Sequence, residues 1–392
     1  MTTLLDAGRS ESSNPPADVL ERIRSIIPEV ATRAAEGELQ RAVPADVIDS
    51  LRSAGVFRMT LPEVWGGEEL GLPEASEVVR EIARADASTA WVVQVGAMSS
   101  LFLRGLPLKT LEDEIFSAGS NSDLLFRGVL APKGKATRVD GGYKISGRWP
   151  LASGSYTPDW VLAGFLVEGA SPLPNGRPDI RVAVVRPEEI AFLDTWDAVG
   201  LRATQSDDFT MDEVFVPEHR TGPLFGDNNI PAPFYNLPYP PSGGSHDAVV
   251  IGVLQGALDD LAELAAVKRP MFNPRIVLGE DPVFQESFGS LRLRTDALTA
   301  LTRENNRTVM DRVLREETPT PVEWLRYEGG HQLIHRQGVE ILNEILTLAG
   351  SAAIYSNSTL QRRWRDLRCV AQHVVANGGQ VRALGAALSG LQ

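Results

Sequence analysis

The chain has 392 residues, of which 43% are hydrophobic and 23% charged, with a net charge of −13 and a single cysteine, Cys369. This length allows two or three domains, the lone cysteine excludes an internal disulfide and a cysteine-based metal site, and the negative charge argues against nucleic acid or an anionic membrane as a partner. Because no apolar run approaches the ~20 residues of a membrane span and residues 1–16 lack a secretory signal, we expect a cytoplasmic protein with a loose N-terminus over those residues.

The first part of the chain has helical periodicity. Apolar residues recur three and four positions apart, and small residues are frequent between Ala90 and Ser100. The predicted helical segments are residues 19–27, 47–51, 74–84 and 87–103, with a turn at 61–67. We therefore expect an all-helical domain over residues 17–121.

From residue 122 the pattern changes to short β-prone runs separated by Gly, Pro and Asp. The spacing of these runs predicts a small antiparallel barrel or sandwich over residues 122–240. The runs are residues 124–126, 143–145, 161–167, 180–185 and 214–216.

A loop at a predicted strand end, residues 147–160, contains Trp149, Ser153-Gly154 and Trp160. Loops at strand ends commonly present binding groups. Tryptophans beside small hydroxyl residues offer a flat apolar surface and hydrogen-bond donors, as a planar heteroaromatic cofactor requires. A β-turn with two core tryptophans explains the same pattern.

Helical periodicity returns after residue 241 in long amphipathic stretches. Their lengths predict a four-helix bundle over residues 241–392. The stretches are residues 248–267, 283–314, 322–348 and 360–388. We therefore expect an α+β protein with a helical domain, a β domain and a helical bundle in that order.

The motifs of nucleotide and nucleophile chemistry are missing from the sequence. It contains no G-x-S-x-G, no phosphate loop and no G-x-G-x-x-G between a strand and a helix. Glu328, His331 and His335 would share one face of a helix, but a di-iron bundle needs two E-x-x-H motifs and further carboxylates. We therefore favour a packed or solvated histidine pair and expect no metal.

Three stretches resemble the acyl-CoA dehydrogenase superfamily, and more narrowly its two-component monooxygenases, which take reduced flavin from a separate reductase. The resemblance covers residue 17 to the C-terminus and implies the same three-part architecture. The stretches are residues 139–160 with Trp149-x-x-x-Ser153-Gly154, residues 200–217 beginning Gly-Leu-Arg-Ala-Thr-Gln-Ser, and residues 360–373 with Arg362-x-x-Arg365-Asp366 before His373.

The resemblance implies that reduced FMN or FAD reacts with O2 to give a C4a-hydroperoxide that oxygenates a small, mostly apolar aromatic compound, amine or thioether. The site must hold the flavin, exclude water and supply hydrogen bonds to the flavin N5 edge. By resemblance, Ser153 contacts that edge and His373 assists proton transfer. These two residues are the candidate catalytic residues.

The same resemblance suggests the remaining binding residues. Arg269 would hold the flavin phosphate, with Arg275 as the alternative, because a guanidinium binds phosphate through two hydrogen bonds. The other candidate flavin contacts are Trp149, Gly154, Thr204 and Ser206, and the candidate substrate contacts are Trp91, Met98 and His246.

Two positions argue against dehydrogenation of an acyl thioester. The dehydrogenases commonly carry a glutamate base in a Tyr-Glu-Gly-Thr segment, and the matching segment here, residues 355–362, reads Tyr-Ser-Asn-Ser-Thr-Leu-Gln-Arg. The other known base position falls near Ser245 and His246, which also lack a carboxylate. A hydroxyl cannot replace that base because its pKa lies far from the working pH.

The substrate is less constrained than the reaction. Residues 90–100 lack the histidine with which related phenol hydroxylases deprotonate the phenol. Either another base acts, with His246 a candidate, or the substrate is an amine, a thioether or an electron-rich ring that needs no deprotonation.

Two further hypotheses concern function, and two expectations concern partners. A flavin dehydrogenase or oxidase acting on a non-thioester substrate is the alternative enzyme, and it would purify with oxidised flavin bound. A catalytically silent protein of the same fold would show no flavin-dependent turnover. The resemblance implies a separate NAD(P)H:flavin reductase as partner and a homotetramer as the assembly.

Overall fold

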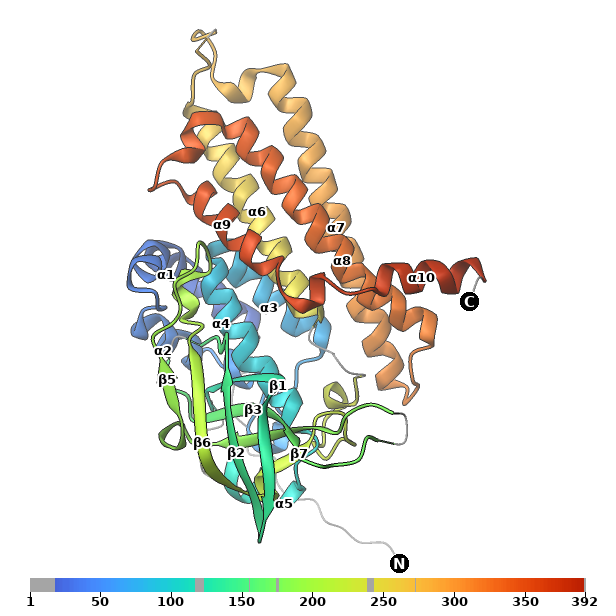
Figure 1. The fold of residues 1–392 in the computed structure, drawn as a ribbon. Helices are drawn as coiled ribbons and strands as arrows, with labels where there is room; N and C mark the ends of the chain where they lie inside the picture. Colours follow the sequence, from blue (N-terminus) through green and yellow to red (C-terminus); the bar gives the residue numbers. More distant parts are fainter. Residues whose placement is uncertain are drawn as a thin grey trace, which may run out of the picture.

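The computed structural model describes residues 18–116, 123–154, 156–173, 176–237, 243–271 and 273–390, so the expected loose N-terminus lies outside the described part. Figure 1 shows the β-strands at one end of the molecule and a long helical bundle at the other. The predicted succession of helical, β and helical parts is confirmed. The domain boundaries near residues 121 and 240 fall outside the described residues and stay predictions. Within the described ranges, no helix is both long and apolar enough to cross a membrane.

The fourth N-terminal helix is buried on nearly every side. The helices are α1 (Val19–Gln40), α2 (Ala45–Ser53), α3 (Leu72–Ala85), α4 (Ala87–Met98) and the short α5 (Leu108–Thr110). The carboxylate of Asp86 caps α4 by accepting hydrogen bonds from the Thr89 backbone N–H at 2.8 Å and the Thr89 hydroxyl at 2.7 Å. Because α4 is apolar all round, other elements enclose it.

The central strands form one mixed sheet, which corrects the expectation of a purely antiparallel barrel or sandwich. The strands are β1 (Phe126–Val139), β2 (Gly142–Trp149), β3 (Trp160–Val167), β4 (Ile180–Val185), β5 (Ala191–Leu193), β6 (Asp208–Pro217) and β7 (Thr221–Pro223). Among the residues described, their order is β5-β6-β2-β1-β3-β4-β7.

The parallel pair β1–β3 results from the path of the chain. Strand β2 runs back along β1, and residues 150–159 then cross to the opposite side of β1. Strand β3 therefore starts opposite the first residue of β1, with Phe126 paired to Trp160, and runs in the same direction. Parallel neighbours require such a crossover connection. In this protein the crossover is the stretch that contains Ser153 and Gly154.

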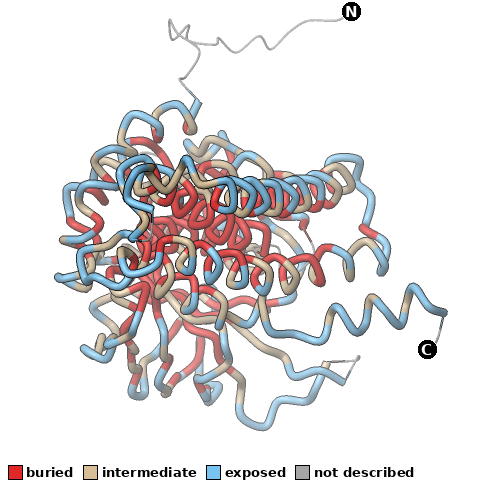
Figure 2. Tube along the Cα trace, turned by 90° about the horizontal axis from the view of Figure 1, so that it is seen from above, coloured by how far each residue is buried: buried red, intermediate tan, exposed pale blue. Residues whose placement is uncertain are grey.

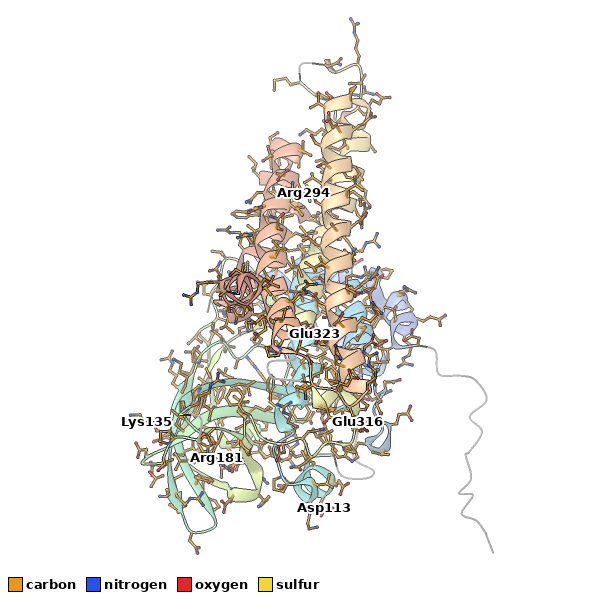
Figure 3. The ribbon with its side chains drawn as sticks, turned by 90° about the vertical axis from the view of Figure 1, so that its right-hand side faces the viewer. Asp113, Lys135, Arg181, Arg294, Glu316 and Glu323 are labelled. Carbon is orange, nitrogen blue, oxygen red and sulfur yellow. The ribbon has the colours of Figure 1, made fainter. Side chains whose placement is uncertain are left out.

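The C-terminal part contains α6 (Gly243–Val267), α7 (Pro282–Leu314), α8 (Pro321–Ala349), α9 (Thr359–Val370) and α10 (Gln380–Ser389). Helices α7 and α8 form a long antiparallel hairpin. The guanidinium of Arg294 bridges to the Glu344 carboxylate at 2.7 Å, and that of Arg312 to Glu323 at 2.8 Å. Figure 3 shows Arg294 far up this hairpin and Glu316 and Glu323 close to its lower end.

The single helix predicted over residues 360–388 is wrong, because the structure divides it at residues 371–379. The side-chain amide of Asn377 donates to the backbone carbonyls of Ala371 and His373, both at 3.1 Å, and so satisfies groups that the end of α9 leaves open. Gly378 and Gly379 follow and favour the interruption. His373 therefore lies in extended backbone before a 3-10 turn. Figure 1 shows α10 projecting beyond the bundle.

Helix α6 lies at the centre of the packing. It contacts α3, α4, α7, α8 and α9, and nearly every residue of its first half is buried. Figure 2 shows the buried residues concentrated in the middle of the molecule and α10 exposed beside them. Polar side chains at the start of α6 are therefore held inside the protein, where they must find partners.

Candidate active site

The crossover of residues 150–159 is fixed to the loop before β6. The backbone N–H groups of Ala152 and Gly154 donate to the carbonyls of Asp207 and Thr204 at 3.0 and 2.9 Å. The buried Arg127 side chain donates to the Ala152 carbonyl at 2.8 Å. Gly154 has a φ of 145°, which L side chains rarely adopt. These contacts set the position of Ser153, which lies between Ala152 and Gly154.

A chain of hydroxyl groups starts at Ser153 and has a fixed direction. The Trp91 indole N–H donates to Ser153 Oγ at 3.0 Å, and Ser153 Oγ lies 2.7 Å from Ser206 Oγ. Ser206 Oγ lies 2.6 Å from Thr204 Oγ1, which donates to the Leu201 carbonyl at 2.8 Å. An indole N–H only donates and a carbonyl only accepts. Each hydroxyl therefore donates toward Leu201, and Ser153 keeps one lone pair for a further donor.

Three rings pack beside this chain. Trp91 meets the edges of His246 and His373 at centroid distances of 5.2 and 5.6 Å, and the two imidazoles stack at 4.3 Å. These rings come from α4, α6 and the break after α9. The structure thus brings together Trp91, Ser153, Thr204, Ser206, His246 and His373, which we call the Trp91 cluster.

The state of His373 follows from its surroundings. Burial of the ring lowers its pKa to about 4, with a smaller contribution from His335. The imidazole is therefore neutral at neutral pH. The Val375 N–H points at Nδ1 at 3.4 Å, so Nδ1 accepts and Nε2 carries the proton. His373 can thus donate one hydrogen bond from Nε2.

A polar residue between α4 and α6, Gln94, was not predicted from the sequence. The side-chain amide nitrogen of Gln94 donates to Ser245 Oγ at 3.1 Å and lies 3.4 Å from His246 Nδ1. Gln94 Oε1 is buried and has no hydrogen-bond partner among the described residues. One signal was present, because Gln94 is a large polar side chain in an apolar helix, where it needs a specific partner.

Trp149 and Met98 are both buried, Trp149 in the sheet and Met98 on α4. Trp149 belongs to the β core, where its ring stacks on Phe209 at 5.0 Å and its N–H donates to the Gly164 carbonyl at 2.8 Å. Met98 lies two helical turns after Trp91 on α4 and is 1% exposed. Their proposed contacts with flavin and substrate stay predictions.

Arg269 lies far from the Trp91 cluster within one chain. It is exposed beyond the end of α6, and its guanidinium donates to the Pro274 carbonyl at 3.1 Å. His246 lies near the start of the same helix, so the two residues are separated by about 30 Å at 1.5 Å per residue. Arg275 is exposed on the same connection. Neither arginine can reach the phosphate of a flavin whose ring lies at Ser153 of its own chain.

The segment of residues 355–362 lies at the wrong place to supply a base. Tyr355 is 65% exposed and precedes α9, whereas His373 follows the other end of that helix. The residue after α9 that belongs to the Trp91 cluster is therefore His373, whose side chain is an imidazole.

The second and third stretches of the resemblance meet in space. The Leu201 N–H donates to the buried Asp366 carboxylate at 2.6 Å, and the Arg365 guanidinium donates to the Val199 carbonyl at 2.7 Å. Burial and the nearby Asp86 raise the pKa of Asp366 to about 7. These contacts join the loop that contains Thr204 and Ser206 to α9.

Two other features lie outside the Trp91 cluster. A cavity of about 780 Å³ opens between α3, α6 and α7, with Ser76, Ala248 and Asn306 in its wall. Ala248 follows His246 by two positions, which turns it to another side of α6. In the part of the chain described, no group of three or more His, Cys, Asp or Glu side chains is arranged to hold a metal ion.

Comparison with known proteins identifies two family domains. Residues 18–105 match the N-terminal domain of acyl-CoA dehydrogenases, and residues 245–378 match their C-terminal domain. These matches cover the helices on both sides of the sheet. They include Trp91, His246 and His373.

Several relatives are similar along nearly their whole length. Indole-3-acetate monooxygenase of Pseudomonas putida is 31% identical over 92% of this chain and 90% of that protein. The oxygenase subunit HsaA of a flavin-dependent monooxygenase from Rhodococcus jostii (strain RHA1) is 28% identical over 88% and 91%. The structure of XiaF from Streptomyces sp. in complex with FADH2 and glycerol has a TM-score of 0.87 and 26% identity, covering 95% of each chain.

Proposed function

We propose that the Trp91 cluster is the oxygenation site of this chain, which belongs to the acyl-CoA dehydrogenase superfamily and to its flavin-dependent monooxygenase branch. The chain is the oxygenase component of such a system and depends on reduced flavin from a separate reductase. We further propose that this reductase takes its electrons from NAD(P)H. When bound, the reduced flavin supplies the electrons that activate O2.

The remaining lone pair of Ser153 is the observation that supports this site most directly. Trp91 and Ser206 use one lone pair and the proton of the Ser153 hydroxyl, so its second lone pair can accept from an N–H group. The N5 atom of reduced flavin carries such an N–H, whereas that of oxidised flavin does not. The hydroxyl chain therefore fits the reduced form of the cofactor.

His373 and the enclosing rings supply the rest of the chemistry. The neutral imidazole presents its Nε2 proton and can donate it to an oxygen atom and later recover it. Trp91, Ser153 and His246 are buried, which limits water at the reacting atoms. The same residues that hold the flavin edge thus also protect the site.

We propose an aromatic substrate with a ring N–H. Among the described residues, no donor reaches the buried Gln94 Oε1 acceptor between α4 and α6, and leaving such an atom unpaired is costly. A ring N–H would supply that donor, and the neighbouring Trp91 and imidazole rings favour packing against a flat ring. The name of the Pseudomonas putida relative, indole-3-acetate monooxygenase, agrees with this substrate class. A ring of this kind needs no deprotonation by a histidine on α4.

Ser153→Ala tests the function. Reduced FMN or FAD is mixed anaerobically with the protein, oxygen and indole are added, and flavin reoxidation, hydrogen peroxide and oxygenated product are measured. We expect the variant to convert at least about tenfold more of the reduced flavin to hydrogen peroxide than to product. Ser146→Ala, which removes a hydroxyl bonded to the Glu213 N–H outside the cluster, should behave like the wild type.

Two results would contradict this function. If wild-type protein leaves the reoxidation of reduced flavin as it is in free solution, the oxygenation site is not here. A protein that purified with oxidised flavin and turned over without a reductase would instead act as a dehydrogenase or oxidase.

We also propose that the chain works as a homotetramer in which Arg269 reaches the flavin phosphate of a second copy. The support is the distance of about 30 Å that separates Arg269 from the cluster of its own chain. Sedimentation should then give four times the chain mass of 42.5 kDa.

Arg269→Ala should weaken binding of reduced flavin about tenfold or more, as expected for a lost charge-assisted hydrogen bond. If only Arg275→Ala weakens binding, Arg275 is the phosphate ligand, and a monomer would overturn the shared site.

A further inference from the structure

A buried arginine joins the crossover to the loop before β6. Arg127 is the second residue of β1 and is 3% exposed. Its Nε donates to the Ala152 carbonyl at 2.8 Å, and its Nη2 donates to the Gln205 carbonyl. Ala152 directly precedes Ser153, and Gln205 directly precedes Ser206. One guanidinium therefore holds the peptide unit before each of the two serines, an arrangement that we call the Arg127 bridge.

The separation of these two serines controls what the Ser153 hydroxyl can do. Ser153 Oγ lies 2.7 Å from Ser206 Oγ, although the two residues belong to different loops. A hydrogen bond between two hydroxyls requires about 2.5–3.0 Å between the oxygens. If the loops moved apart by about 1 Å, this bond would break. The Ser153 proton can then turn toward the flavin, and Ser153 becomes a donor where the site needs an acceptor.

Both loops adopt backbone conformations that need support. Gln205 has a φ of 46°, in the left-handed region that a residue with a side chain enters only at a cost in energy. A Cβ at Gly154 would lie 3.1 Å from both Cγ and Cδ of Arg127, so the glycine leaves space for the arginine side chain. The two backbone hydrogen bonds between the loops do not depend on the guanidinium. Loss of the Arg127 bridge should therefore loosen the loops without unfolding them.

The guanidinium is itself held in place and charged. Its central carbon lies 4.3 Å from the centre of the Phe192 ring of β5, a favourable contact between a cation and an aromatic face. The Asp207 carboxylate lies 3.8 Å from Nη2. Burial lowers the pKa of Arg127 to about 10, so the side chain stays charged at neutral pH. Because hydrogen bonds from a charged donor are stronger than those from a neutral one, Arg127 suits a role that fixes two loops.

We propose that Arg127 is a positioning residue for Ser153: its two hydrogen bonds fix the separation of the Ser153 and Ser206 hydroxyls, so that Ser153 accepts the N–H of reduced flavin and offers no proton to oxidised flavin. The inference rests on the proposed contact of Ser153 with the flavin N5 edge. It adds the residue that makes this contact selective for the reduced form. The position of the Ser153 hydroxyl can be measured without flavin.

The first test compares two indole N–H groups by NMR in protein labelled with 15N. The Trp91 indole donates to Ser153 Oγ at 3.0 Å, and the Trp149 indole donates to the Gly164 carbonyl at 2.8 Å inside the β core. The signals of these two among the seven tryptophans are identified with Trp91→Phe and Trp149→Phe. Arg127→Lys keeps the charge but offers one nitrogen in place of two. We expect exchange with D2O to become about tenfold faster at Trp91 and to stay unchanged at Trp149.

Two further variants make this test decisive. Arg138→Lys changes another arginine of β1, which pairs with Glu218 at 3.0 Å, and should leave the exchange at Trp91 unchanged. Phe192→Leu removes the ring that faces the guanidinium but leaves its donors, and should accelerate exchange at Trp91 by a smaller factor even if Arg127→Lys does not fold. Equal acceleration at Trp91 and Trp149 in Arg127→Lys would show a purely structural role and overturn the proposal. Unchanged exchange at Trp91 in the folded Arg127→Lys and Phe192→Leu proteins would overturn it as well.

Flavin binding offers a second readout with a different meaning. The dissociation constants of reduced flavin, measured anaerobically, and of oxidised flavin are compared between the wild type and Arg127→Lys. We expect the preference for the reduced form to fall about tenfold in the variant, as for the loss of one well-placed hydrogen bond. If exchange at Trp91 accelerates while this preference stays the same, the Arg127 bridge stands and the proposed contact of Ser153 with the flavin N5 edge fails. The two proposals therefore fail through different observations.

Discussion

Replacing His373 with alanine is expected to lower the amount of product formed per reduced flavin by about 10²-fold, the lower end of what a positioned proton donor contributes. The lost reducing equivalents should appear as hydrogen peroxide, because the variant lacks the Nε2 proton while flavin and oxygen still meet. The measurement is the ratio of product to peroxide after a single addition of reduced flavin. The binding constant for reduced flavin, measured anaerobically, should change much less than this ratio.

A surface histidine provides the control. His219 is exposed and lies 3.2 Å from the Glu114 carboxylate, so His219→Ala should not alter the ratio. In the wild type, His373 should cause no change in the ratio of product to peroxide between pH 8 and about pH 5. Its pKa of about 4 keeps the imidazole neutral over that range. A ratio that survives the loss of His373 would remove this residue from the chemistry.

Trp149→Ala should lower the free energy of unfolding by about 3–5 kcal/mol, the usual cost of removing a large buried aromatic side chain. The indole is fully buried in the β core, stacks on Phe209 and donates to the Gly164 carbonyl. Urea unfolding followed by circular dichroism measures the loss. An effect of this size is expected even if Trp149 never touches the flavin.

Trp149→Phe separates the structural role from the flavin contact expected from the sequence. Phenylalanine can still stack on Phe209 but cannot donate to Gly164, so we expect a loss of about 1–3 kcal/mol in stability. The affinity for reduced flavin should remain that of the wild type. If flavin affinity fell tenfold while stability was unchanged, Trp149 would be a flavin contact after all.

Most of the architecture was predictable because periodicity is a local property. The α7–α8 hairpin was clear from its apolar repeat, and the change to short β-prone runs located the sheet. The parallel pairing of β1 with β3 could not be seen, since it depends on where residues 150–159 travel after β2. The break at residues 371–379 was signalled by Asn377-Gly378-Gly379, but an apolar repeat resumes beyond it and suggested one continuous helix.

The candidate site was predictable only where a residue belongs to a motif. Ser153 and His373 came from motif positions, and the structure places both beside Trp91. The role of Gln94 depends on which residue faces it across α4 and α6, and Ser245, which accepts its hydrogen bond, lies 151 residues further along the chain. Sequence spacing within one helix gives the side on which a residue lies but not its partner.

The crossover of residues 150–159 limits how an enzyme of this design can change its substrate. Both ends of the crossover continue into strands that flank β1, and its backbone is bonded to residues 204 and 207. An insertion there would shift two strands at once, together with the oxygen atom of Ser153. The facing sides of α4 and α6 are under no such restraint, because a side chain can be exchanged without moving the backbone. Selection for new substrates should therefore act on the helices, while the reactive edge is inherited unchanged with the sheet.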